Sequence, residues 1–131
     1  SHAKKLGMQP LARIVGHANN AGVPALFPIA PVGAIQKLLK NIDWSVDSVD
    51  LFEINEAFAV VAMAAIHDLK LDAEKVNIHG GACALGHPIG ASGARILVTL
   101  LGALKKNGLK RGVASLCIGG GEATALAIEM Y

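Results

Sequence analysis

Residues 112–130 read GVASLCIGGGEATALAIEM, and this stretch decides the topology of the expected fold. It holds two largely apolar runs, 112–118 and 123–130, on either side of three consecutive glycines. A connection this short lets two strands pair only in the antiparallel sense. The stretch therefore predicts an antiparallel pair of strands at the C-terminal end of the sequence.

Upstream of this pair, the sequence alternates short β-rich runs with runs of helical period. We predict three further strands at residues 11–17, 49–54 and 76–79, and three helices at residues 31–42, 56–69 and 93–107. Strands that alternate with helices are typical of βαβ units, which build largely parallel sheets. The pattern thus predicts one α/β domain over residues 1–131, of order βαβαβαββ, with a five-stranded mixed sheet and helices on both faces.

The composition is unusually poor in charge for a chain of 131 residues, which is the length of one domain. Hydrophobic residues make up 53% and charged residues only 17%, against about 25% in ordinary domains. The longest unbroken apolar run, residues 57–66, is about half of what a bilayer requires, so we expect no membrane span. The predicted helix at 56–69 is apolar on every face, which is typical of a helix buried all round. We therefore expect another protein layer over it.

Charge and cysteine content limit the other classes of partner. The formal net charge is +2, the lysines are scattered and aromatic residues make up 4%, so the sequence lacks both the basic stripe and the stacking platform of a nucleic-acid binder. The only cysteines are Cys83 and Cys117, too few for a secreted disulfide framework. With no secretory signal visible, we expect a cytoplasmic protein.

Three chemically useful side chains lie at the carboxyl ends of predicted strands: Asn55 and His87 come after their strands, and Cys117 closes its own. In open α/β sheets, ligands bind outside the carboxyl ends of the strands, so we expect the three to meet at one edge. An Asn can donate to an oxyanion or hold a water, a His can act as general base, and a Cys can be a nucleophile or a proton shuttle. The glycines from Gly119 onward would let backbone N–H groups approach a ligand closely.

Each of these residues also has a purely structural interpretation. Asn55 could simply cap a helix, His87 could be a turn residue satisfied by backbone, and Cys117 could be a small buried hydrophobic residue. The glycines could form no more than a tight hairpin. Only the joint placement of these residues at one edge favours a functional site.

Two weaker alternatives concern the glycine-rich loop. His79, Cys83 and His87 recur every four residues, but their spacing does not match the usual zinc ligands, so we predict no metal site. The glycines at 86, 90 and 93 precede a predicted helix and could cradle a phosphate. They match neither the P-loop nor the dinucleotide fingerprint.

Three blocks of the sequence resemble a known family in order and spacing. They are NEAF at residues 55–58, GHPIGASG at residues 86–93 and CIGGG at residues 117–121. Together they resemble the three signatures of the C-terminal half of thiolases, and the resemblance covers essentially the whole chain. It implies a reversible Claisen condensation of acetyl-CoA, or thiolysis of 3-ketoacyl-CoA, through an acyl-cysteine intermediate. CoA thioesters would be substrates, and no cofactor is implied.

The resemblance also implies roles for individual residues. His87 would activate the nucleophilic thiol, and Cys117 would be the second cysteine, which removes or returns the α-proton. Asn55 would hold a water in one oxyanion hole, and the Gly119 N–H would contribute to the other. Ala57 and Phe58 would line the acyl pocket.

The family pattern further implies what this sequence lacks. In thiolases the acyl-accepting cysteine and most CoA contacts belong to the N-terminal half, so we expect this fragment to be inactive alone and to need that half. The family commonly forms dimers and tetramers, so we expect a homo-oligomer. Two other interpretations stay open: a non-catalytic association module on the same fold, and a hydrolase in which Cys117 is itself the nucleophile and His87 its base.

Overall fold

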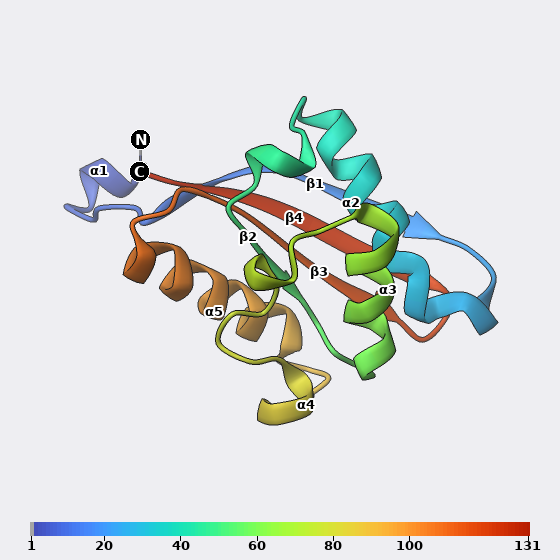
Figure 1. Cartoon of the computed structure of the whole chain (residues 1–131). Coiled ribbons are helices and arrows are strands. Elements are labelled where there is room, and N and C mark those ends of the chain that lie inside the picture. The colour runs from blue at the N-terminus through green and yellow to red at the C-terminus, as the bar shows by residue number, and fades with distance from the viewer. Residues whose placement is uncertain (1) are drawn as a thin grey trace.

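The structure is a computed structural model that describes residues 2–131, so Ser1 of the predicted domain lies outside the described residues. The strands are β1 (Ala12–Ala21), β2 (Leu51–Ile54), β3 (Arg111–Ile118) and β4 (Glu122–Met130). The α-helices are α1 (His2–Lys5), α2 (Ala30–Asn41), α3 (Ala59–Leu69), α4 (Ala82–Leu85) and α5 (Ser92–Asn107). Three short 3-10 helices, Pro24–Ile29, Val46–Ser48 and Ala73–Lys75, complete the set (Figure 1).

The strands form one mixed sheet in the order β1-β4-β3-β2. β2 runs parallel to β3, while β3 and β4 are antiparallel, as are β4 and β1. The glycine turn between β3 and β4 therefore makes the antiparallel pair that the sequence predicts. Gly121, at φ 97°, supplies the left-handed backbone conformation that closes this turn.

Helices cover both faces of the sheet, as predicted (Figure 1). α2 and α3 pack on one face, where Val113 and Cys117 of β3 join their core. α5 packs on the other face against Leu51 and Ala114. Side chains alternate between the two faces along β3, so this strand contributes to two separate apolar layers, one on each side of the sheet.

The prediction of five strands is wrong, because residues 76–79 do not form one. Val76 makes only an isolated parallel bridge with Phe52. The next residue, Asn77, has φ 50°, which turns the chain out of the sheet. Its side chain takes the place of the next ladder step: Oδ1 accepts from the Ile54 N–H and Nδ2 donates to the Ile54 carbonyl, both at 2.8 Å.

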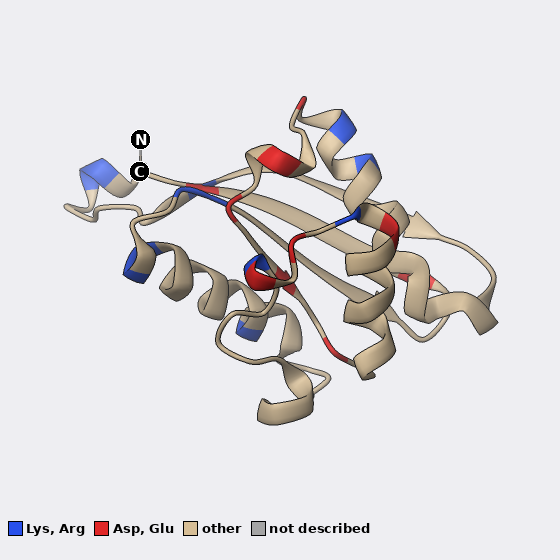
Figure 2. Ribbon diagram, viewed as in Figure 1, with Lys and Arg blue, Asp and Glu red and all other residues tan. Residues whose placement is uncertain are grey.

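The apolar helix predicted at 56–69 begins three residues later, as α3, and is exposed along one side in this chain. Phe58 at its N-cap is 60% exposed and Met63 is 64% exposed. The helix itself carries one acidic residue, Asp68, and neither Lys nor Arg (Figure 2). The protein layer expected over this side stays a prediction. Within residues 2–131, the structure has no helix that is both long and apolar enough to cross a membrane.

Candidate active site

A cavity of about 380 Å³ opens at the carboxyl ends of β2 and β3, and it gathers most of the residues predicted from sequence. Ala57 and Phe58 come from the segment after β2, His87 from the loop between α4 and α5, and Cys117 and Gly119 from the end of β3 and the turn beyond it. The remaining wall is apolar, formed by Phe27, Ile89, Leu116 and Ile118. Asn55, the sixth predicted residue, does not line the cavity but contacts His87 behind it.

Asn55 continues the line of β2 and is fully buried. Its backbone N–H donates to the Ser115 carbonyl at 2.9 Å, which holds the residue against β3. Its side-chain Oδ1 accepts from the Arg95 guanidinium at 3.2 Å, and its Nδ2 lies 3.4 Å from Nε2 and 3.5 Å from Nδ1 of His87. Asn55 does not cap α3, whose N-cap is Phe58, so the capping interpretation is wrong.

The neighbours of His87 determine which of its ring nitrogens carries the proton. Nδ1 lies 2.6 Å from Ser92 Oγ, and that hydroxyl donates its own proton to the Pro88 carbonyl at 3.0 Å. Ser92 can therefore only accept from His87, so Nδ1 is the protonated nitrogen of the neutral ring. The Nε2 lone pair is left to take a proton from a reactant, as a general base must.

Cys117 is 8% exposed, and burial raises the pKa of its thiol above the ordinary value of 9.0. The thiol is therefore protonated at neutral pH and has a proton to deliver. A nucleophilic cysteine is generally marked by a lowered pKa. The direction of the shift thus disfavours the hydrolase interpretation, in which Cys117 would be the nucleophile, and suits an acid–base role.

In the Gly119–Gly121 turn, one glycine has no room for a side chain and another has free space around it. A Cβ on Gly121 would lie 2.6 Å from the Gly22 carbonyl oxygen, so this position has no room for a side chain. A Cβ on Gly119 would meet no atom within 4 Å, because this residue faces the open cavity. The backbone at Gly119 is therefore accessible to a bound molecule, which a tight hairpin alone would not require.

Glu56, a half-buried carboxylate not predicted from the sequence, ties α4, which precedes the His87 loop, to the turn at Asn77. Its Oε2 accepts from the Cys83 N–H at 3.0 Å, and its Oε1 accepts from Asn77 Nδ2 at 3.2 Å. A Cβ on Gly81 would fall 2.3 Å from the Glu56 carboxyl carbon, so a glycine is needed there for this approach. The signal was present, since Glu56 lies inside the NEAF block.

A buried ion pair behind Asn55 was likewise not predicted from the sequence. Glu53 of β2 is 1% exposed, and its Oε2 lies 3.4 Å from a guanidinium nitrogen of Arg95 on α5. Burial raises the pKa of Glu53 to about 7, although the Arg95 charge opposes this shift. A single acidic residue inside the apolar run 51–54 was the available signal, because an unpaired charge is rarely buried.

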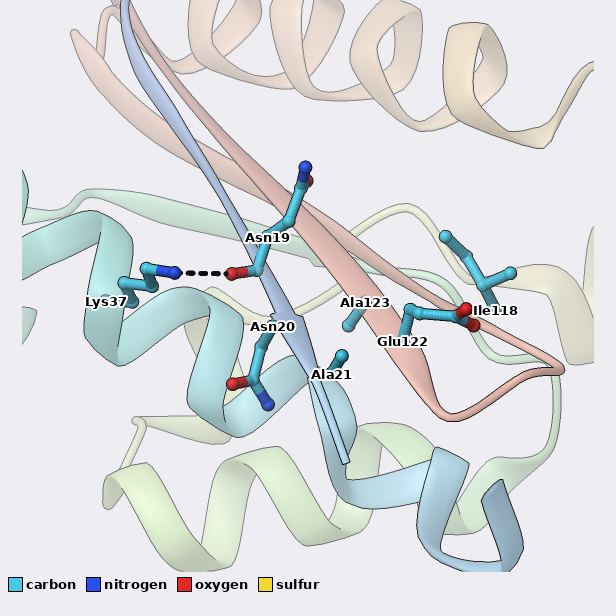
Figure 3. A pocket seen from close by; sticks show the side chains of 7 residues that line it. All are labelled: Asn19, Asn20, Ala21, Lys37, Ile118, Glu122 and Ala123. Atoms are coloured by element: carbon cyan, nitrogen blue, oxygen red, sulfur yellow. Dashed lines mark hydrogen bonds between the residues drawn. The ribbon is translucent and has the colours of Figure 1, made fainter. Parts of the chain in front are cut away.

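A second hollow, of about 540 Å³, lies on the other side of the β3–β4 turn and contains none of the predicted site residues (Figure 3). Lys37 donates to the Asn19 carbonyl at 3.1 Å at one side of it, and Glu122 lies at the other side (Figure 3). A Cβ on Gly120 would lie 2.6 Å from a Glu122 carboxylate oxygen, so the side chain of Glu122 lies close to the turn. Among residues 2–131, no cluster of His, Cys, Asp and Glu could hold a metal ion.

The fold and the site together define an α/β domain that brings a histidine, a buried thiol and an amide side chain together at the carboxyl ends of two parallel strands. Known proteins of similar sequence identify the family. Residues 8–130 match the family described as "Thiolase, C-terminal domain". The chain therefore belongs to the thiolase family.

Individual relatives agree with this assignment. The chain is 57% identical over 129 residues to the "probable acetyl-CoA acetyltransferase" of Dictyostelium discoideum, covering 98% of this chain and 31% of that protein. The crystal structure of the acetyl-CoA acetyltransferase of Bacillus anthracis superposes with a TM-score of 0.96 at 52% identity, covering 99% of this chain and 33% of the other. The human mitochondrial 3-ketoacyl-CoA thiolase gives a TM-score of 0.96 at 45% identity, with the same coverage. The chain thus spans about a third of the length of these relatives.

Proposed function

We propose that this chain is the C-terminal catalytic domain of a thiolase that condenses two acetyl-CoA molecules or cleaves 3-ketoacyl-CoA. The observation that carries the proposal is the shared cavity of His87, Cys117 and Gly119, with Asn55 in contact with His87. The relatives named acetyl-CoA acetyltransferase support acetyl-CoA as the substrate that we propose.

In this proposal, His87 Nε2 takes the proton of the nucleophilic thiol, which the N-terminal half supplies. The thiolate attacks the keto carbon of the substrate, and the bond between the α and β carbons breaks. The electron pair passes to the departing enolate of acetyl-CoA, which receives a proton from Cys117. The thiolate left on Cys117 takes the proton of the CoA thiol, and the CoA sulfur attacks the acyl-cysteine, whose thiolate leaves and regains its proton from His87. In synthesis the steps reverse: Cys117 protonates the departing CoA, and the thiolate so formed removes a proton from the methyl group of the second acetyl-CoA.

Oxyanion stabilisation comes from two places in the cavity wall. Asn55 Nδ2 and His87 would hold a water or a thioester oxygen on one side, and the Gly119 N–H would donate on the other. Each fixed donor of this kind is worth roughly 3–4 kcal/mol of barrier. Ala57 and Phe58 line the space for the acyl chain, and CoA thioesters are the substrates, with no further cofactor in the reaction.

The partner we propose is the N-terminal half of a thiolase, seated over the exposed side of α3. Val60 and Met63 on that side are more than half exposed, an unusual position for such residues on one helix. Alone, the chain has no cysteine in the position of the acyl acceptor, so we expect it to be inactive. The proposed full enzyme is a homo-oligomer in the cytoplasm; a relative at 50% identity is the cytosolic acetyl-CoA acetyltransferase of Mus musculus.

The test is the loss of acetoacetyl-CoA in the presence of CoA, for this chain alone and after mixing with the N-terminal half from the same source. We expect activity only after mixing, and its loss in the His87→Ala variant. Activity of the chain alone would contradict the proposed division of labour. Reassembly without activity toward a panel of 3-ketoacyl-CoAs would instead favour a non-catalytic association module, which the exposed side of α3 would also suit.

A further inference from the structure

Arg95 connects two side chains on the same face of the strand that leads into the site. Glu53 and Asn55 are two residues apart along β2 and its extension, so both point toward α5, where Arg95 lies. One guanidinium nitrogen of Arg95 lies 3.4 Å from Glu53 Oε2, and the other donates to Asn55 Oδ1 at 3.2 Å. One side chain therefore bridges a buried carboxylate and the amide that contacts His87.

The chemistry of these groups fixes the orientation of the amide. A guanidinium only donates, so the Asn55 atom that faces Arg95 must be the oxygen. The amide nitrogen then points to the His87 ring, 3.4 Å from Nε2 and 3.5 Å from Nδ1. A flipped amide would set its N–H groups against the Arg95 cation and lose the hydrogen bond that Oδ1 accepts.

The ion pair is an incomplete one. Within residues 2–131, Glu53 Oε1 and Arg95 Nε have no hydrogen-bond partner although both atoms are buried. Apolar residues of similar volume often replace such a pair at no cost in stability. A contribution to stability therefore does not explain why Glu53 and Arg95 are buried together. The hydrogen bond from Arg95 to Asn55 does explain it.

We propose that Arg95, held in place by Glu53, is a positioning residue that keeps the Asn55 amide turned with Nδ2 toward His87. This inference deepens the proposed function, on which its kinetic consequence rests. Without Arg95, the Asn55 amide has no fixed donor behind it and rotates. The donor that would hold a water or an oxyanion is then lost for part of the time.

The first test uses the 131-residue chain and needs no activity. The double variant Glu53→Leu with Arg95→Met removes both charges and leaves no buried ion uncompensated. Nitrogen-15 NMR follows the Asn55 side-chain amide, assigned against Asn55→Asp, and the ring nitrogens of His87. We expect the double variant to melt near the wild-type temperature, while the Asn55 amide signals move and the His87 Nε2 resonance shifts.

Arg13→Met is the matched control. It removes the ion pair between Arg13 and Glu129, whose atoms lie 2.7 Å apart on a distant part of the sheet, where Arg13 is exposed. It should leave the Asn55 and His87 signals unchanged. If the first double variant melts well below wild type, Glu53→Gln with Arg95→Met replaces it, because a neutral amide at 53 leaves no unpaired charge. A folded variant with wild-type Asn55 and His87 signals would overturn the proposal.

The second test measures thiolysis after mixing with the N-terminal half. We expect kcat to fall about 100-fold in the double variant, the usual cost of a misplaced catalytic group, with KM nearly constant. An unchanged kcat in a folded variant would overturn the positioning role. If the wild-type mixture is itself inactive, the proposed function fails, and the NMR result still decides whether Arg95 orients Asn55.

Discussion

Ser92 Oγ lies 2.6 Å from His87 Nδ1 and donates its own proton to the Pro88 carbonyl, so Nδ1 carries the proton of the neutral His87 ring and Nε2 does not. Ser92 is the first residue of α5 and is fully buried. The tautomer of the candidate base is thus set by the start of a helix, and the reactive nitrogen is left free.

Ser92→Ala should therefore remove the preference of His87 for the tautomer protonated at Nδ1. Without an acceptor, Nδ1–H loses a hydrogen bond worth about 1 kcal/mol, and the two neutral tautomers should approach equal populations. Nitrogen-15 NMR of the imidazole ring measures this directly at a pH where the ring is neutral. Ser92→Thr keeps the hydroxyl and is the control; equal ring spectra for the alanine variant and wild type would contradict the assignment.

Much of this arrangement was predictable from sequence because it depends on local periodicity. The helices expected at 31–42 and 93–107 appear as α2 and α5 within one residue at each end, since each carries a continuous apolar stripe. The glycine turn and the strands that it joins were predictable for the same reason. The nearness of Asn55 and Cys117 followed from the rule that parallel strands place their carboxyl ends at one edge, whereas His87 follows no strand and reaches this edge through the loop after α4.

The remainder depends on contacts between distant residues, and these leave no local pattern. Val76 begins a run with strand character, but the Asn77 side chain bonds both polar groups of Ile54 and ends the ladder there. Arg95 and Glu53 are separated by 42 residues, and their pairing depends on how α5 packs on β2. Periodicity specifies that the helix packs on the sheet, but not which polar side chains then meet.

The two cysteines should contribute very differently to activity. Cys117→Ser should reduce thiolysis by the mixed halves by about 10²- to 10⁴-fold, the range for loss of a general acid–base group, because a hydroxyl is a far weaker acid than a thiol. Cys83→Ser is the matched control, since Cys83 is exposed and its side chain lies outside the cavity. Comparable losses in both variants would argue against a specific role for Cys117.

Glu53 should make the stability of the chain fall as pH rises. Its pKa is raised from 4.5 to about 7 in the folded state, so folding favours the protonated form. The favourable contribution is complete below pH 4.5 and is lost as pH rises through 7, an effect of up to roughly 3 kcal/mol. Urea unfolding at pH 5 and pH 8 should show this loss in wild type and a smaller one in Glu53→Gln.

Glu129→Gln provides the control for this measurement. Arg13 and Arg111 lower the pKa of Glu129, so its contribution to stability is lost only in acid, below the window from pH 5 to pH 8. This variant should therefore keep the wild-type difference in unfolding free energy between the two pH values. If Glu53→Gln instead parallels wild type, Glu53 does not titrate in that range.

Gly121 and Gly119 should separate the folding of the turn from the chemistry of the cavity. Gly121→Ala places a Cβ 2.6 Å from the Gly22 carbonyl oxygen at φ 97°, so it should lower the free energy of unfolding by about 1–3 kcal/mol. Gly119→Ala has open space and should melt near wild type, yet its methyl group enters the cavity and should raise KM for acetoacetyl-CoA in the mixed enzyme. Thermal melts and steady-state kinetics on both variants measure the two effects.

Equal destabilisation by the two variants would mean that both glycines are needed for folding. A normal KM for Gly119→Ala would show that substrate does not approach this side of the cavity.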